Sequence, residues 1–430
     1  MKEGKAVEAP WISSPSPSLT QRFPRPIDRA GRPLRVSELL WISLYWFASS
    51  FQWGALLAVV LPAEVLRFAP EAQKGSYLAV LFAAGAVIAL VMSPLAGAWS
   101  DRCTLALGRR RPFIVLGTLI NCGGLVGMHA ASSFPWFLGA FLVVQMANNL
   151  AAGAFHGLLP DKVPPAQRGL GSGLMGLLMM LGTIAAAVAS GRLVGQGQTG
   201  SVYWLIAIVL LAGMTLTLWK VREEPLEVAP PWRLLAFVRS LWIDPRQYPD
   251  FAWMFATRGL VMLGYYTLLA FLQFFVKDTL HLAPSQAAQT TGFLSAVAVA
   301  AGTVVAVAAG WASDRVGRKA IVSIAGTFLA ATCFGLLVQP PLWVLVGVAV
   351  LFGIGSGAYT SVDWALAIDV LPSANSAAKD LGVWAVANTL PQVLAPLVAG
   401  PILDHYNRQA SNFGYTVIFS SAIIYIALGS

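Results

Sequence analysis

The sequence predicts an all-α membrane protein with twelve transmembrane helices in two pseudo-symmetric six-helix halves. Three observations carry this prediction. Hydrophobic residues make up 57% of the 430-residue chain and charged residues only 11%, whereas soluble proteins contain about 25% charged residues. Apolar stretches of roughly 20 residues or more, long enough to cross a bilayer, recur along the chain. Two loop motifs stand at matching places in the first and second halves.

Charges, prolines and glycines separate the apolar stretches from one another. The predicted helices cover residues 38–66, 76–99, 112–132, 135–160, 170–194, 201–219, 251–276, 286–312, 320–339, 341–368, 381–403 and 413–430. The proline-rich residues 1–37 are predicted to be a disordered cytoplasmic tail, and 221–249 a cytoplasmic linker between an N-terminal half at 38–220 and a C-terminal half at 250–430. The long unbroken apolar runs exclude the alternating strands of an outer-membrane barrel.

The basic residues indicate topology rather than nucleic-acid binding. With the N-terminus in the cytoplasm, 22 of the 28 Lys and Arg residues fall on the cytoplasmic side, five on the opposite side, and Arg258 inside a helix. Cytoplasmic loops of membrane proteins carry such an excess. We therefore expect a multi-pass monomer with both termini in the cytoplasm. It would lie in the plasma membrane (the inner membrane if bacterial), in contact with lipids and with no nucleic-acid partner.

Two motifs recur in the same order in both halves. GAWSDRCTLALGRRRP follows the second predicted helix and GWASDRVGRK the eighth, while LLPDKVPPAQRG follows the fourth and AIDVLPSANSAAKD the tenth. Gly permits close approach of helices, Asp can pair with Arg, and Arg remains at the headgroups. Simple charge anchoring is the alternative, but it requires neither Gly nor Asp. The residues expected to act in conformational gating are Gly97, Asp101, Arg102, Arg109, Arg110, Asp161, Arg168, Gly310, Asp314, Arg315, Arg318 and Asp369.

These repeated GxxxDR and GR loops resemble the hallmark of the major facilitator superfamily. The first copy has five residues, CTLAL, between DR and GR, and in this it is similar to the plant sucrose transporters and related sugar carriers. FQWGALLAVVLP, MANNL and DLGVWAVANTLPQVLAP are also similar to stretches of those carriers. The resemblance implies two six-helix halves around a central cavity, and a sugar carried together with protons.

Three places depart from the plant carriers. Gln145 stands where those carriers have Asp, His156 stands where they have Arg, and FFVKDTLH replaces their DTDWMGRE. In the family these residues are thought to serve proton coupling and sucrose recognition. The resemblance therefore does not extend to the groups that would choose the sugar or couple the proton.

Polar residues within the apolar stretches share helix faces. In the fourth predicted helix, Gln145, Asn148 and His156 lie on one face, and the first, seventh and tenth helices carry similar stripes. Polar groups within a membrane by default face a bundle interior or a wet cavity. For each residue alone the alternative is a packing hydrogen bond or, for an aromatic ring, core filling. The expected substrate-binding residues are Gln52, Gln145, Asn148, Asn149, Tyr265, Tyr266, Gln273, Tyr359 and Asn388.

Two charged residues lie at similar depth in the predicted C-terminal half. Arg258 is eight residues from Asp250 in the seventh helix, and Asp363 is six residues before Asp369 in the tenth. Because an unpaired charge in a membrane is costly, we expect an ion pair between them. The residues expected to act in proton coupling are Asp363, as the titrating group, with Arg258, and then His156.

No pattern for catalysis or for a cofactor is present in the sequence. The chain has no P-loop, GxSxG elbow or HExxH site, and Cys103, Cys122 and Cys333 are too scattered for a disulfide framework or a metal site. The sequence therefore predicts no enzyme and no cofactor. It predicts a secondary active transporter for proton-coupled uptake of a small sugar, a disaccharide or glucoside such as sucrose, by alternating access. The alternatives are a drug or metabolite exporter of the same fold, and a non-transporting membrane assembly factor.

Overall fold

A computed structural model describes residues 34–164, 167–221, 223, 246–369 and 377–430. Eleven of the described helices are long and apolar enough to cross a membrane, and a twelfth apolar helix of 17 residues ends the chain. The described part of the chain contains no strand. The prediction of an all-α bundle is confirmed. Most of the predicted tail and linker lie outside the described residues.

The first half follows the predicted helices with small shifts at their ends. Its elements are α1 (Val36–Ala55), η1 (Leu56–Val60), α2 (Leu61–Phe68), η2 (Glu71–Gln73), α3 (Lys74–Ser100), α4 (Arg111–His129), α5 (Phe134–Phe155), α6 (Leu158–Lys162), α7 (Arg168–Gly195) and α8 (Thr199–Lys220). The fourth helix was expected to run to residue 160 but ends at Phe155. A turn at Gly157 follows it, and the Arg110 guanidinium fills the space where a Cβ at Gly157 would stand.

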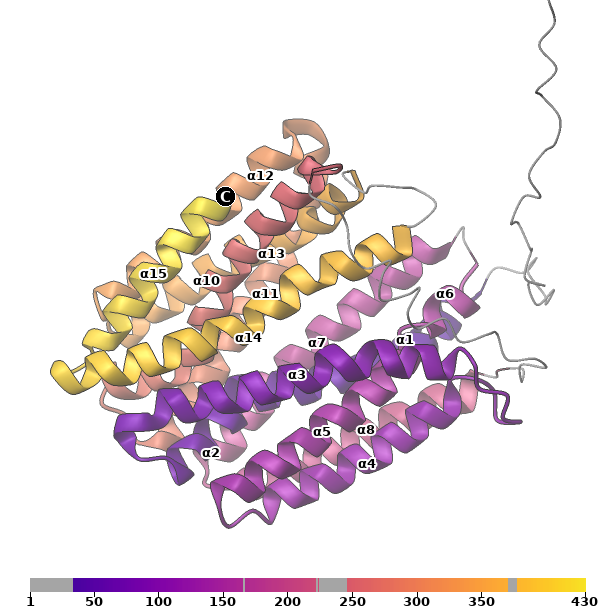
Figure 1. The fold of residues 1–430 in the computed structure, drawn as a ribbon, viewed down its shortest axis with the longest axis horizontal. Coiled ribbons are helices and arrows are strands. Elements are labelled where there is room, and N and C mark those ends of the chain that lie inside the picture. The colour runs from indigo at the N-terminus through magenta and orange to yellow at the C-terminus, as the bar shows by residue number, and fades with distance from the viewer. Residues whose placement is uncertain (1–33, 165–166, 222, 224–245, 370–376) are drawn as a thin grey trace, which may run out of the picture.

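The second half repeats the order of long helices. Its elements are α10 (Pro249–Thr279), α11 (Pro284–Val316), α12 (Arg318–Leu337), α13 (Leu342–Asp369), α14 (Ala377–Gln409) and α15 (Phe413–Gly429). The two halves meet along two long helix pairs, α3 with α14 and α7 with α11 (Figure 1). The second helix of one half thus packs on the fifth of the other, as expected for two related halves.

Glycines allow the backbones to approach at both seams. A Cβ on Gly75 of α3 would stand 2.6 Å from the carbonyl oxygen of Gly400 in α14. At the other seam a Cβ on Gly292 of α11 would stand 3.0 Å from the Cα of Gly191 in α7. A side chain at any of these four positions would push the halves apart.

The first transmembrane segment, Val36–Phe68, contains a π-helical turn. The π-helical η1 separates α1 from α2, and the Leu61 N–H bonds back to the carbonyl of Leu56. Pro62, directly after this segment, has no N–H with which to bond the carbonyl of Ala58. A π-bulge beside a proline changes the direction of a helix and leaves carbonyl groups in need of donors.

The two ends of the bundle differ in charge. We call the end that contains loop 101–110 and α6 the basic end, and the end that contains η2 and residues 277–283 the opposite end. Successive long helices run alternately between these ends. The predicted gating loops therefore lie at the basic end.

Candidate substrate cavity and its gates

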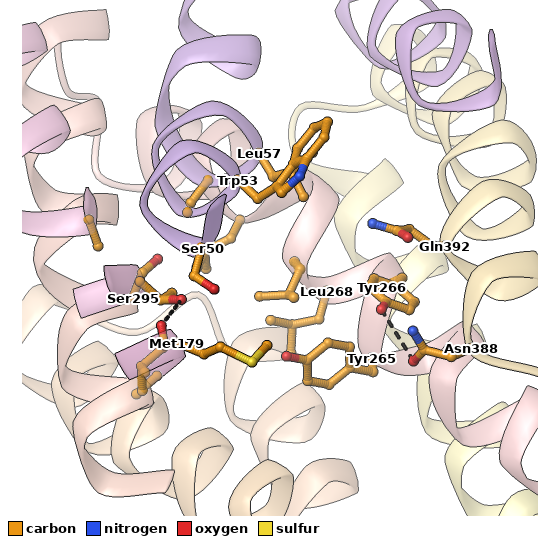
Figure 2. A pocket seen from close by; sticks show the side chains of 18 of the residues that line it. Ser50, Trp53, Leu57, Met179, Tyr265, Tyr266, Leu268, Ser295, Asn388 and Gln392 are labelled. Carbon is orange, nitrogen blue, oxygen red and sulfur yellow. Dashed lines mark hydrogen bonds between the residues drawn. The ribbon is translucent and has the colours of Figure 1, made fainter. Parts of the chain in front are cut away.

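A cavity of about 640 Å³ lies between the two halves, beside the middle turns of helices from both. In Figure 2, Ser50 and Trp53 of α1 lie across the open space from Gln392 of α14. None of the described residues that line it is Asp, Glu, Lys or Arg. The predicted site residues that line it are Gln145, Asn148, Asn149, His156, Tyr265, Tyr266 and Asn388.

The N-terminal wall presents amide groups from α5. Asn149 Nδ2 donates to the backbone oxygen of Gln145 at 2.8 Å and to its side-chain oxygen at 3.3 Å. The side chain of Asn148, one residue earlier, makes no such bond within the described part of the chain and faces the cavity. Within α5, Asn148 is therefore the amide that is available to pair with a bound hydroxyl.

His156 lies toward the basic end of the same wall. Its ring stacks on Trp46 of α1, with ring centroids 4.7 Å apart and planes inclined by 4°. Both residues line the cavity, and the imidazole is exposed to it. This pair presents a flat aromatic surface beside polar groups, a combination that suits a sugar ring.

The C-terminal wall combines rings and amides. The Tyr266 hydroxyl donates to Asn388 Oδ1 at 3.3 Å (Figure 2). Gln392 stands one helical turn after Asn388 and faces the same space. Tyr265 stacks on Phe352 of α13, with ring centroids 5.1 Å apart.

Helix α1 divides its polar residues between two faces. Trp46, Ser50 and Trp53 line the cavity. Gln52 faces α4 instead, where its amide exchanges two hydrogen bonds with the buried amide of Asn121, at 2.8 and 3.2 Å. Tyr45 likewise bonds a side chain of α4. Gln52, predicted to bind substrate, thus pairs two helices of one half.

Gln273 and Tyr359 also lie outside the cavity lining. With its amide nitrogen turned toward η1, Gln273 donates to the carbonyl oxygens of Ala58 at 3.0 Å and Val59 at 3.1 Å; the reverse orientation would place oxygen against oxygen. Tyr359 is buried in α13. The face that α13 presents to the cavity is apolar, since Leu345, Val348, Ala349 and Phe352 line it. The polar stripe expected on the tenth helix does not reach the cavity.

The structure brings Arg258 and Asp363 together. Arg258 Nη1 of α10 lies 2.6 Å from Asp363 Oδ2 of α13, and both side chains are buried. Neither residue lines the cavity. Removing one member of this pair would leave the other as an unpaired charge inside the bundle, which is strongly destabilising.

The first copy of the gating motif forms a network inside the N-terminal half. Arg110 bonds Asp101 at 2.9 Å and Asp161 at 2.6 Å, and Arg109 bonds the same Asp161 oxygen at 2.6 Å. Arg102 donates to a carbonyl of its own helix. Gly97 lies where α3 passes α5, so the loop is fixed to both helices.

The second copy is described only in part. The Arg315 guanidinium lies 3.8 Å from the centre of the Trp311 ring. Gly310 has open space beside it, and Arg318 begins α12. The side chains of Arg168, Asp314 and Asp369 lie outside the described part of the structure.

Ion pairs join the two halves at the opposite end. Lys74 of α3 lies 2.5 Å from Asp278 of α10, and Lys277 lies 2.9 Å from Glu71 of η2. Lys74 also contacts Glu71, so the four charges alternate in sign. Among the described residues, these are the ion pairs that cross between halves.

A carboxylate strengthens the same contact. Asp404 of α14 accepts from the backbone N–H of Gly75 at 2.9 Å and of Ser76 at 2.7 Å, and from the Ser76 hydroxyl at 2.6 Å. It therefore caps the N-terminus of α3 from the other half. The opposite end is held closed by these bonds and by the close backbone contact beside them.

Several lining residues were absent from the sequence prediction. Trp46, Thr183, Ser295 and Gln392 line the cavity. Two of them had a usable signal in the sequence. Gln392 lies four residues after Asn388 on the same helix face, and Trp46 lies four residues before Ser50 and seven before Trp53 on one face of α1. Thr183 and Ser295 are single polar residues on apolar helices, where periodicity carries no information on orientation.

Curated relatives and solved structures agree with this architecture. The chain is 26% identical over 255 residues to proton-associated sugar transporter A of Homo sapiens, covering 53% of this chain and 33% of the relative. It is 29% identical over 187 residues to a sucrose transport protein of Arabidopsis thaliana, covering 37% of this chain and 36% of that protein. The matched region thus spans about a third of each relative's length.

Two solved structures share the fold. A bacterial homologue of the human lysosomal transporter Spinster, in an inward-facing and unoccupied conformation, has a TM-score of 0.65 at 18% identity and covers 91% of this chain and 92% of its own. A nucleoside transporter has a TM-score of 0.73 at 13% identity and covers 91% and 98%. The sequence profile of the Major Facilitator Superfamily matches residues 39–396. The chain therefore belongs to the major facilitator superfamily and is a multi-pass membrane protein.

Proposed function

We propose that this protein takes up a small neutral sugar, a disaccharide or glucoside such as sucrose, together with protons by alternating access. One observation carries the proposal: a cavity of about 640 Å³ between the halves that is lined by amides and aromatic rings, with no Asp, Glu, Lys or Arg among its described lining residues. Cavities of this size take molecules of one or two rings. Amides both donate and accept, as sugar hydroxyls require.

The sidedness is part of the proposal. The excess of Lys and Arg at the basic end supports a cytoplasmic location for it. Because the cross-half bonds lie at the opposite end, we propose that the structure represents the state open toward the cytoplasm. Uptake would then require the bonds of Lys74, Asp278 and Asp404 to break and form again in each cycle.

The coupling site is proposed to be the buried pair Arg258 and Asp363. A proton on Asp363 would cancel its charge and weaken the 2.6 Å contact, so protonation would change the packing of α10 against α13. Tyr266 lies two turns along α10 from Arg258 and lines the cavity, which gives a short physical route from the pair to the substrate.

The deciding experiment is uptake of radiolabelled sucrose, maltose and an aryl glucoside by liposomes containing the purified protein, with an imposed proton gradient. Accumulation of one of these sugars supports the proposal. Asp363→Asn should abolish accumulation and retain exchange, and the double variant Arg258→Gln with Asp363→Asn controls for an unpaired buried charge. If Asp363→Asn still concentrates the sugar, coupling lies elsewhere and His156→Gln is the next variant.

Substrate contact is tested separately at Asn148. Loss of an amide that pairs with a buried hydroxyl costs about 1 to 3 kcal/mol, or roughly 5- to 150-fold in affinity. Asn148→Ala should weaken sugar binding by that amount, whereas Asn149→Ala should have a smaller effect because Asn149 bonds its own helix. Equal effects at both positions would contradict this orientation of α5.

An exporter of lipophilic molecules is the second candidate. The apolar wall formed by Leu345, Val348 and Phe352 favours it, although the same wall could hold the apolar part of a glucoside. Proton-driven movement of lipophilic dyes without sugar flux would support the exporter. No flux of either kind would support a non-transporting assembly factor.

A further inference from the structure

A second hollow lies at the basic end, away from the central cavity. It has a volume of about 520 Å³ and is bounded by the start of α1, the end of α6 and the end of α8. Its residues belong to one half, and none of them lines the central cavity. It has no place in the transport cycle described above.

Three cations converge on this hollow. They are Arg35, Lys162 and Lys220, and within the described part of the chain none of them forms an ion pair. Glu38 also lines the hollow, but its carboxylate accepts from the backbone N–H of Arg35 at 2.7 Å. The lining described thus has an excess of positive charge.

The walls of the hollow are fixed by other contacts. Gln167, just before α7, donates to the carbonyl of Leu34 at 3.0 Å and accepts from its N–H at 2.7 Å, which holds the start of α1. Asp161 is bonded to the gating loop, so the position of the adjacent Lys162 is set by that network. The hollow is therefore shaped before any ligand arrives, which lowers the entropic cost of binding.

The position of the hollow at the ends of two membrane-spanning helices indicates the level of the lipid headgroups. α1 begins and α8 ends beside it, and the indole of Trp219 is 68% exposed there, with Lys220 Nζ 4.1 Å from the ring centre. The half-buried Trp41 extends its wall along α1 away from the basic end, while Ile42 below it is buried in the core. Exposed tryptophans mark the interface of membrane proteins, and basic pockets between helices at that level attract phosphate groups.

We propose that this hollow binds the phosphate of an anionic phospholipid, with the headgroup among Arg35, Lys162 and Lys220 and the first part of an acyl chain against the indole of Trp41. The same three cations would also attract a free phosphate ion, because both ligands carry a charged phosphate. The accessible indole of Trp41 favours the lipid, because a free ion has no apolar group to cover it.

The test is native mass spectrometry of the full chain in detergent with added phosphatidylglycerol, phosphatidylcholine or inorganic phosphate. The variants are Lys162→Gln, Lys220→Gln and the double variant. Lys319→Gln, an exposed lysine at the same end but outside the hollow, is the matched control. Each basic residue near a membrane surface strengthens the binding of anionic lipid. Loss of one of these lysines should therefore weaken phosphatidylglycerol binding about fivefold, and loss of both should weaken it about 25-fold.

Retention of phosphatidylglycerol over phosphatidylcholine by the wild type and by Lys319→Gln, with loss in the double variant, supports the site. Equal retention by the double variant would overturn it. If the wild type bound phosphatidylcholine as well as phosphatidylglycerol, the charge of the lipid would not select the ligand and the proposal would be wrong. Displacement of the lipid by millimolar inorganic phosphate would show that a free ion is the ligand. Because the readout is binding, it does not depend on the proposed sugar transport.

Discussion

Gln273 is expected to stabilise the closed opposite end, and Gln273→Leu should release that end. The side chain reaches from α10 in one half to the Ala58 and Val59 carbonyls of η1 in the other. Pro62 supplies no N–H to Ala58, so the amide of Gln273 replaces a missing helical donor. Leucine has a similar volume and no donor.

The size of the effect follows from the bonds lost. A buried carbonyl without its donor costs about 1 to 3 kcal/mol. That loss falls only on the state in which α10 contacts η1, so the population with the opposite end open should rise roughly 5- to 150-fold relative to the closed state. Opening exposes the cavity to reagents that reach only that end.

The assay uses a single cysteine, Ser50→Cys, in a chain whose three native cysteines are replaced by serine. An impermeant thiol reagent is added at the opposite end, and Gln273→Leu should raise its labelling rate at position 50. Gln52→Leu is the matched control, since it removes a buried amide that bonds Asn121 within the same half. The control should lower thermal stability and leave labelling unchanged. An unchanged labelling rate in Gln273→Leu, with lowered thermal stability, would refute the reasoning, because the contact would then persist in both states.

Three further predictions concern packing, the closed end and topology. Gly153→Ala should reduce thermal stability in detergent by about 1 to 3 kcal/mol, because its Cβ would stand 2.7 Å from a carbonyl oxygen of α3; unchanged unfolding would contradict the close packing of α3 and α5. Lys74→Ala removes the buried cation of this network and should destabilise the closed end by about 1.5 to 3 kcal/mol. Lys277→Ala should cost less than about 1 kcal/mol, because Glu71 is exposed and Asp278 keeps Lys74 as its partner. Equal shifts in melting temperature would argue against that ranking. A cysteine at Gln198 should react with an impermeant reagent outside intact cells and one at Lys319 should not, and the reverse pattern would invert the proposed orientation.

The sequence alone determined the class of fold and much of one cavity wall. A chain with such long apolar runs is stable only in a membrane, and the repeated loop motifs indicate two related halves. The 3.6-residue period then places Gln145 and Asn148 on one face of α5, with His156 directly after its last residue, and the structure directs all three toward the cavity. Similar depth and the cost of an unpaired charge in a membrane predicted that Arg258 and Asp363 would pair, as they do.

Only the tertiary structure decided which polar face meets which neighbour. Periodicity groups residues on one side of a helix but does not fix how the helix is rotated in the bundle. Gln52 and Trp53 are adjacent in sequence, yet Gln52 pairs with Asn121 and Trp53 faces the cavity. Gln273 has the same amide as a substrate-binding residue, but the break at Pro62 in another half gives it a structural partner. Such partners are set by packing between segments that are distant in the chain, so the sequence of one helix does not specify them.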